Sequence, residues 1–335
     1  MANSLVSILI PFKNVEEYFD ECLESIRNQN YQNWEVIAIN DHSDDNSLAI
    51  AKRFSQLDNR FKIFTNTESG IITALRNAYG YSRGEFITRM DADDHMGQDR
   101  INTMLTSLKE KGKGSLAIGQ VKYFAKEGLN DGYDRYAKWL NELTAGGTNF
   151  EEIYKECVIP SPCWMVHRTD LDLCGAFLPD RYPEDYDLAF RFYEKGLTCI
   201  PCNKTLHYWR DYETRTSRTS EHYAQNYFLE IKLHYFLKLE YTLNKTLVVW
   251  GAGKKGKTIA KSLTENKIPF KWVCDNPKKI GKDIYGVKLI HYTELKTIED
   301  PQIIITVANE EEQLSIKSIF TDLKKMPAQD YFFFC

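Results

Sequence analysis

The sequence predicts an α/β protein with a doubly wound, mostly parallel sheet, followed by a second, smaller Rossmann-like α/β unit. Three observations predict it. Apolar runs alternate with amphipathic helical stretches through residues 7–90, which favours a parallel sheet covered by helices. Polar clusters follow the apolar runs, and ligands bind where the strands of such sheets end. The alternation then restarts at Thr246, directly before Gly251-x-Gly253-x-x-Gly256.

The first unit is expected to begin with four strands and three helices. Strands are expected at residues 7–11, 34–39, 61–64 and 86–90. Helices are expected at residues 15–29, 47–57, 72–81 and, further on, 188–195. In the first helix Phe19, Leu23 and Ile26 recur at a spacing of three to four, which is typical of one buried helix face. Residues 119–183 have a less regular pattern that is rich in aromatic residues.

The second unit repeats the alternation on a smaller scale. Strands are expected at residues 246–250, 270–274 and 302–307, and helices from the glycine-rich run to 264 and at 311–324. A long aromatic helix at residues 221–243 precedes it, and its face is not rich in Lys or Arg, so interdomain packing is preferred to membrane or partner binding. We expect a first domain at residues 1–220, this connecting helix, and a second domain at residues 244–335.

The glycine-rich run has the spacing of a dinucleotide-binding fingerprint, between a strand and a helix. Asp275 follows near the position expected of a ribose-binding acid. However, the unit is short for a complete dinucleotide domain, and Lys254 and Lys255 replace the usual small or apolar residues. A scaffold or homo-oligomer role is therefore preferred to nucleotide binding, and a dehydrogenase is the least favoured interpretation.

Length and composition exclude several classes of protein. The 335 residues carry a formal net charge of −4, with 27% charged residues, which gives no general attraction to nucleic acid. We find no run long enough for a transmembrane span and no basic region of a signal peptide. The eight cysteines are expected to be reduced, because nothing in the sequence signals export. Cys199 and Cys202 have no second pair at zinc spacing, so packing is preferred to a metal site. We expect a cytoplasmic protein.

The most informative feature is the run Asp91-Ala92-Asp93-Asp94, directly after an expected strand. Three carboxylates within four residues repel one another, and a hard divalent cation binds such oxygen ligands, usually shared with phosphates. The alternative is a solvated acidic loop that caps the helix beginning near Arg100.

Other charged residues stand where they can join this run. Asp41 follows the second strand and should face the same cleft, in which a metal-bridged nucleotide diphosphate fits. Arg76 lies on the third helix and suits a phosphate or a carboxylate. Glu184 and Asp185 begin a helix, so they are either helix-start carboxylates or a general base.

These stretches resemble those of the family 2 glycosyltransferases, which have the GT-A fold and use nucleotide sugars. The resemblance covers roughly residues 4–220. It rests on residues 6–14, 40–47, 70, 74–78, 84–94 and 184–188, in this order. Each piece is weak alone, but the order and register together are highly specific.

The resemblance implies a binding site for the donor. Asp41 should contact the nucleobase, with Pro11 lining its pocket. Gly70 and Arg76 should lie near the ribose and the diphosphate. Asp91 should take part in donor binding.

The resemblance also implies the chemistry. Asp91 and Asp93 correspond to the family's DxD motif, with Asp93 the direct ligand of Mn²⁺ or Mg²⁺. Asp185 corresponds to the catalytic base of an inverting displacement, and Glu184 to its neighbour, which binds the acceptor. Trp164 lies in a region that helps to form the acceptor pocket in relatives, where it either stacks on a sugar or packs in the core.

Two residues depart from the family pattern. Asn40 replaces one acid of the usual pair, which leaves only Asp41 for the nucleobase. Tyr212 stands where many relatives carry a histidine near the metal, for which His207 is a candidate substitute. These departures keep a second interpretation open, in which the chain is a catalytically degenerate nucleotide-binding or assembly protein of the same fold.

We therefore expect a hexosyl- or N-acetylhexosaminyl-transferase of bacterial surface polysaccharide synthesis. Its expected partners are a nucleotide-sugar donor and a glycan or lipid-linked acceptor. UDP is preferred to other nucleotides in the donor. No nucleic acid is expected. Peripheral contact with the inner face of the membrane is compatible with a lipid-linked acceptor, and a homo-oligomer through the C-terminal domain is compatible with its scaffold role.

Overall fold

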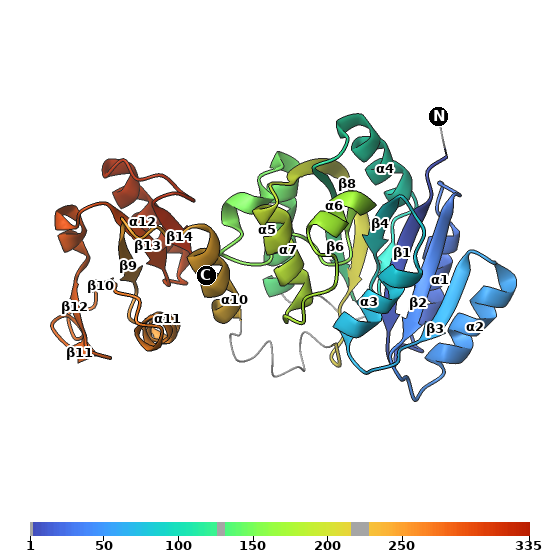
Figure 1. The fold of residues 1–335 in the computed structure, drawn as a ribbon, viewed down its shortest axis with the longest axis horizontal. Coiled ribbons are helices and arrows are strands. Elements are labelled where there is room, and N and C mark those ends of the chain that lie inside the picture. Colours follow the sequence, from blue (N-terminus) through green and yellow to red (C-terminus); the bar gives the residue numbers. More distant parts are fainter. Residues whose placement is uncertain (1–2, 126–130, 216–227) are drawn as a thin grey trace. The chain divides into compact units, whose positions relative to one another are not determined.

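The computed structural model describes residues 3–125, 131–215 and 228–335 and divides into two compact units (Figure 1). The first contains Met1–Phe150 and Val158–Arg218, and the second contains Glu151–Cys157 and Thr219–Cys335. Within the described part of the chain, no helix is long and apolar enough to cross a bilayer.

The described part of the first unit contains an eight-stranded sheet in the order β3-β2-β1-β4-β7-β6-β8-β5. Its strands are β1 (Val6–Phe12), β2 (Trp34–Asn40), β3 (Phe61–Thr65), β4 (Phe86–Arg89), β5 (His95–Met96), β6 (Ser115–Phe124), β7 (Trp164–His167) and β8 (Thr198–Arg210). The first four pair in parallel, as do β6 and β8, whereas β7 is antiparallel to β4 and β6, and β5 to β8. The expected doubly wound, mostly parallel sheet is confirmed.

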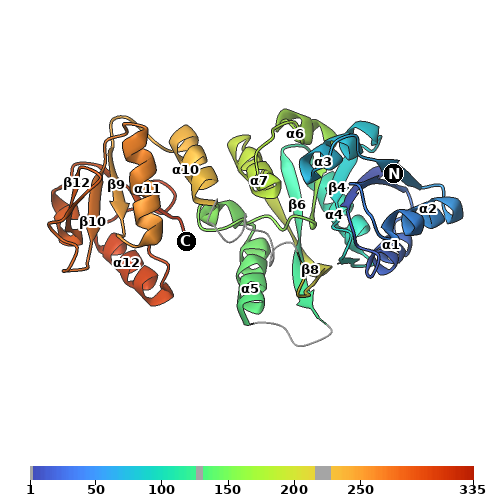
Figure 2. The ribbon, with the colours of Figure 1, turned by 90° about the horizontal axis from the view of Figure 1, so that it is seen from below.

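Helices cover both faces of this sheet. They are α1 (Phe19–Arg27), α2 (Ser47–Leu57), α3 (Ile71–Tyr81), α4 (Arg100–Lys111), α5 (Asp131–Gly146), the short 3-10 helix η1 (Asn149–Glu152), α6 (Arg168–Leu173) and α7 (Glu184–Glu194). Figure 2 shows α3, α6 and α7 along one side of the sheet, and α1 and α5 along the other. The strands near the middle of the sheet are consequently buried on both faces, which explains their continuous apolar runs.

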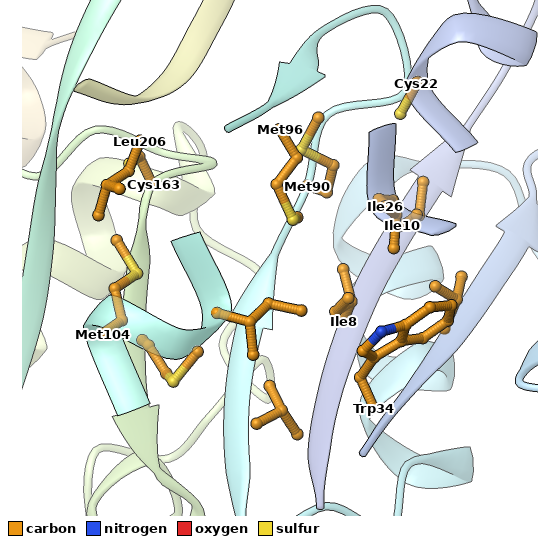
Figure 3. Packing of buried hydrophobic residues seen from close by; sticks show 14 of the residues in the cluster. Ile8, Ile10, Cys22, Ile26, Trp34, Met90, Met96, Met104, Cys163 and Leu206 are labelled. Atoms are coloured by element: carbon orange, nitrogen blue, oxygen red, sulfur yellow. The ribbon is translucent and has the colours of Figure 1, made fainter. Parts of the chain in front are cut away.

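The core of the first unit lies between the sheet and the helices on the face that carries α1. Ile8 and Ile10, two residues apart in β1, both point toward this face. They pack near Ile26 of α1 and Trp34 of β2 (Figure 3). All four side chains are at most 1% exposed. Burial on this scale contributes roughly 1.5–3 kcal/mol for each large apolar side chain, so the strand ends that carry the polar clusters are held on a rigid base.

The described part of the second unit contains a six-stranded sheet in the order β11-β12-β10-β9-β13-β14. Its elements are α10 (Phe228–Leu239), β9 (Thr246–Trp250), α11 (Lys254–Glu265), β10 (Lys271–Cys274), β11 (Asp283–Ile284), β12 (Val287–His291), η2 (Tyr292–Thr297), β13 (Pro301–Ile305), α12 (Glu310–Asp322) and β14 (Tyr331–Phe333). Figures 1 and 2 show α11 and α12 on opposite faces of this sheet, because the chain leaves the central strands in opposite directions with the same crossover hand. Residues 221–227 of the helix expected at 221–243 lie outside the described residues.

The segment Glu151–Cys157 belongs to the second unit, although its neighbours in sequence belong to the first. Tyr154 stacks on Phe334 with 5.5 Å between the ring centroids. The buried Lys232 ammonium donates to the carbonyl oxygens of Lys155 at 2.8 Å and Phe334 at 3.2 Å. The expected first domain therefore differs from the first compact unit by this segment, which no local sequence pattern marks.

The three glycines of the glycine-rich run have different environments. A Cβ atom on Gly256 would lie 2.0 Å from the Gly251 carbonyl oxygen, and one on Gly251 would lie 2.4 Å from Thr306 Oγ1. Gly253 has no atom within 4 Å of the corresponding position. Packing alone therefore explains two of the three glycines, and the fingerprint spacing does not by itself require a bound nucleotide.

This difference gives a test of the second unit. Gly256→Ala should destabilise the protein by about 1–3 kcal/mol or more, as overpacking does, although alanine is the better helix former. Gly253→Ala is the matched control and should cost about 1 kcal/mol or less, the usual range for a helix N-cap change. Urea unfolding of the full chain, followed by tryptophan fluorescence, measures both. Equal stability of the two variants would contradict the packing account.

Candidate active site

The sheet register brings the predicted donor-site residues to one edge. Strand β1 pairs in parallel with β2 on one side and with β4 on the other. Pro11 stands near the carboxyl end of β1. Asp41 directly follows β2, and Asp91 follows β4 after Met90. All three residues therefore lie at the binding edge of a doubly wound sheet.

Asp41 and Gly70 are in direct contact. The buried carboxylate of Asp41 accepts from the Gly70 backbone N–H, at 3.0 Å to each oxygen, and from Asn66 Nδ2 at 2.8 Å. Gly70 has φ +131°, a conformation that favours glycine. Asn66 is held in turn by Asn77 Nδ2 at 2.7 Å. Gly70 thus orients Asp41, and Asn66 is a site residue that the sequence analysis missed.

Arg76 is engaged with the segment that precedes α7. Its Nε donates to the carbonyl oxygen of Phe177 at 3.1 Å and its Nη2 to that of Leu178 at 2.8 Å. The guanidinium also pairs with Asp180. These bonds link α3 to the loop that leads to Glu184, so Arg76 supports the geometry of this edge. Contact of Arg76 with a diphosphate stays a prediction.

Asp94, the third acid of the run, is a structural residue. It is fully buried and accepts from His207 Nε2 at 2.9 Å and from the Arg210 backbone N–H at 2.7 Å. Arg100 Nη1 lies 3.2 Å from His207 Nδ1, and since a guanidinium only donates, the ring proton resides on Nε2. Burial, with Arg100 beside the ring, lowers the pKa of His207 well below its usual range. His207 is thus a neutral support for the acidic loop.

Asp93 is partly exposed, and several charges act on its carboxyl group, among them the opposing guanidinium of Arg215. Burial and the neighbouring Asp94 carboxylate raise the pKa of Asp93 to about 7. The Tyr212 hydroxyl donates to Asp93 Oδ2 at 2.9 Å, and Arg210 Nε donates to the Asp93 carbonyl oxygen at 2.8 Å. The Tyr212 ring packs on Tyr18 with centroids 4.8 Å apart. Tyr212, noted as a departure from the family pattern, is therefore a direct neighbour of the predicted metal ligand.

A buried arginine joins the acidic run to helix α7. Arg89, the last residue of β4, is 5% exposed. Its Nη2 lies 3.1 Å from Asp91 Oδ1, and its Nη1 lies 2.9 Å from Glu184 Oε1. The sequence analysis missed this residue. One sequence signal could have found it, namely a single arginine in an otherwise apolar strand. A buried charge requires partners of opposite sign, so such an arginine indicates nearby carboxylates.

Asp185 stands beside this pair in the first turn of α7. The helix begins at Glu184 rather than at residue 188, so both acids lie at its N-terminus. Asp185 Oδ1 accepts from the Tyr186 backbone N–H at 2.8 Å. Burial and the adjacent Glu184 carboxylate raise the pKa of Asp185 to about 7, against the opposing effect of Arg89. A carboxyl group with such a pKa can exchange protons near neutral pH.

Trp164 lies in the core. Its side chain is 2% exposed and packs edge-on against Phe192 with centroids 5.7 Å apart. Stacking on a sugar needs an open ring face. This burial favours the core-packing alternative.

The comparisons with known proteins identify the family. The model for glycosyl transferase family 2 matches residues 7–174, and that for the C2185-like N-terminal family matches residues 243–325. The chain belongs to glycosyl transferase family 2. Among its relatives, EpsH of Bacillus subtilis is 27% identical over 60% of this chain and 59% of that protein. Glycosyltransferase GlyA of Streptococcus pneumoniae is 31% identical over 63% of this chain and 31% of that protein. The matches thus span less than two thirds of either relative.

Solved structures with a similar fold support the GT-A assignment. Staphylococcus aureus TarS 1–349 in complex with UDP-GlcNAc superposes with a TM-score of 0.54 at 16% identity, over 78% of this chain and 72% of that one. The mannosyltransferase PcManGT of Pyrobaculum calidifontis, in complex with GDP-Man and Mn²⁺, has a TM-score of 0.53 at 18% identity, over 68% and 64%. At these identities the likeness shows the fold.

The donor set at the edge fits a cation that shares its ligands with a substrate. Among the residues described, no three His, Cys, Asp or Glu side chains form a metal cage. In the described acidic loop, Asp91 and Asp93 are the predicted carboxylate ligands. Mg²⁺ is usually bound by one or two carboxylates together with substrate phosphates and water, so the residues present fit such a metal.

Proposed function

We propose that this family 2 protein is a metal-dependent, inverting glycosyltransferase. It transfers a hexosyl or N-acetylhexosaminyl group from a nucleotide sugar to a hydroxyl of a glycan or lipid-linked acceptor. A UDP-sugar is the preferred donor in this proposal. One observation carries the proposal. A metal-type acid pair, Asp91 and Asp93, and a base-type acid pair, Glu184 and Asp185, meet at one sheet edge through Arg89.

Donor binding falls to the residues at the ends of β1 and β2. Asp41, already oriented by Gly70, would accept from the nucleobase beside Pro11, and Arg76 would approach the diphosphate. Asp93, with Asp91 beside it, would hold Mn²⁺ or Mg²⁺. When bound, the ion supplies positive charge that stabilises the departing diphosphate.

Asp185 performs the proton transfer in this proposal. It accepts the proton of the acceptor hydroxyl as that oxygen forms its bond to the anomeric carbon. The bond from the same carbon to the diphosphate oxygen breaks, and the configuration inverts because attack and departure occur on opposite faces. Glu184, held by Arg89, positions the acceptor.

The relatives suggest a polysaccharide setting. Chondroitin synthase of Pasteurella multocida is 29% identical over 61% of this chain, although the match covers only 21% of that enzyme. We propose a role in surface polysaccharide synthesis on the cytoplasmic side of the membrane. The second unit, with its own core, would serve as a scaffold or homo-oligomer contact.

A nucleotide panel tests the proposal. UDP with Mn²⁺ should raise the melting temperature of the full chain more than UDP or Mn²⁺ alone, because ligands stabilise the state that they bind. Incubation with nucleotide sugars should release the nucleoside diphosphate slowly, by hydrolysis. Binding without any turnover on a panel of donors and acceptors would favour the degenerate binding protein. Stabilisation by NAD alone would contradict the proposal.

A further inference from the structure

Arg89 forms a described ion pair with one member of each acidic pair. Its guanidinium meets Asp91 from the metal-type pair and Glu184 from the base-type pair, at 3.1 and 2.9 Å. Neither Asp93 nor Asp185 has an ion pair with it among the described contacts. Among the described contacts, Arg89 therefore divides the four carboxylates into two that it holds by ion pairs and two that it does not.

The position of Arg89 is fixed from several sides. The residue ends β4, and its carbonyl oxygen accepts from Arg100 Nη2 at 2.7 Å. Its side chain is almost fully buried, and Glu184 is 9% exposed. A planar guanidinium can bind two carboxylates with separate nitrogens, whereas a lysine ammonium is a single point charge. The residue type thus matches the bridging geometry.

We propose that Arg89 is a positioning residue that selects the working carboxylate of each pair, and this rests on the proposed function. By holding Asp91 it weakens that carboxylate as a metal ligand, so that Asp93 is the direct ligand. By holding Glu184 it turns this side chain away from proton transfer and leaves Asp185 as the base. The same contact ties the metal loop to the base helix.

A charge argument separates this role from a structural one. Arg89 places a positive charge against Asp91, two residues before Asp93. A cation held by Asp93 would be repelled by this like charge in a partly buried site. Removing the guanidinium should therefore tighten metal binding while it slows transfer. A residue that only maintained the fold would weaken both together.

The test uses Arg89→Gln combined with Glu184→Gln, with Glu184→Gln alone as the matched control. The double variant leaves no unpaired Glu184 charge in the core, and it should fold. We expect Mn²⁺ binding in the presence of UDP, followed by electron paramagnetic resonance, to tighten about tenfold over the control, from the loss of one nearby charge. The single-turnover rate should fall about 10- to 100-fold below the control, the usual effect of losing a ligand's supporting partner.

Arg89→Lys provides a second variant that keeps the charge in the core. It should change Mn²⁺ affinity less than twofold and still slow transfer, because one ammonium cannot hold both carboxylates. Unchanged or weaker Mn²⁺ binding in the double variant would overturn the proposal, as would full activity of Arg89→Lys. Failure of the unaltered protein to bind Mn²⁺ with UDP would instead refute the proposed function.

Discussion

Asp93→Ala should abolish detectable transfer and remove the effect of Mn²⁺ on nucleotide binding. Asp93 lies beside Asp91, the carboxylate that Arg89 holds, and it accepts a hydrogen bond from the Tyr212 hydroxyl. Without this ligand the diphosphate charge goes uncompensated, both in the bound donor and as the leaving group departs. Calorimetric titration with UDP, with and without Mn²⁺, measures the loss.

Asp134→Ala is the matched control for this variant, because Asp134 is an exposed acid of α5. It should bind and transfer as the unaltered protein does. If Asp93→Ala retains nucleotide binding with the same dependence on Mn²⁺, Asp93 is not the metal ligand.

Asp185→Asn should lower the single-turnover rate by roughly 10²–10⁴, the usual contribution of a general base. The amide keeps the size of the side chain and its bond to Tyr186 but cannot take the acceptor proton. Donor affinity should hardly change, because the proposal assigns donor binding to Asp41 and the metal ligands. In the unaltered protein the rate should rise with pH through about 7, since the base acts in its ionised form and its pKa is raised to about 7.

Glu184→Gln is the informative comparison for Asp185→Asn. Glu184 is adjacent in sequence but is already paired with Arg89, so its loss should raise the KM for acceptor more than it lowers the rate at saturation. A near-normal rate for Asp185→Asn, together with a large loss for Glu184→Gln, would exchange their roles.

The sequence was sufficient for the parts of the fold that local patterns determine. The expected strand at residues 7–11 is β1, Val6–Phe12, and the helix at residues 47–57 is α2. The helix expected from residue 15 begins at Phe19, because the backbone first turns through a bond from the Tyr18 N–H to the Val15 carbonyl. Such boundary shifts are small, since buried periodicity is a strong signal.

The remaining features depend on tertiary contacts. The antiparallel strand β7 lies between β4 and β6 and pairs with both. The periodicity of a sequence does not encode such long-range pairing. Asp94 looks like a third metal ligand in sequence, yet its partners His207 and Arg210 are more than a hundred residues away. The bridge from Arg89 to Glu184 has the same origin. Residue type predicted the chemistry at this edge, and only the fold shows which carboxylates are already paired.

The most direct test of the account is the anomalous diffraction signal of manganese in crystals grown with UDP and Mn²⁺. The account predicts one peak within about 2.0–2.3 Å of an Asp93 carboxylate oxygen, typical of a small divalent cation with oxygen ligands. The diphosphate should share this ion, and the uracil should lie against Asp41. Manganese bound away from Asp93, or UDP bound at the glycine-rich run of the second unit instead, would contradict it.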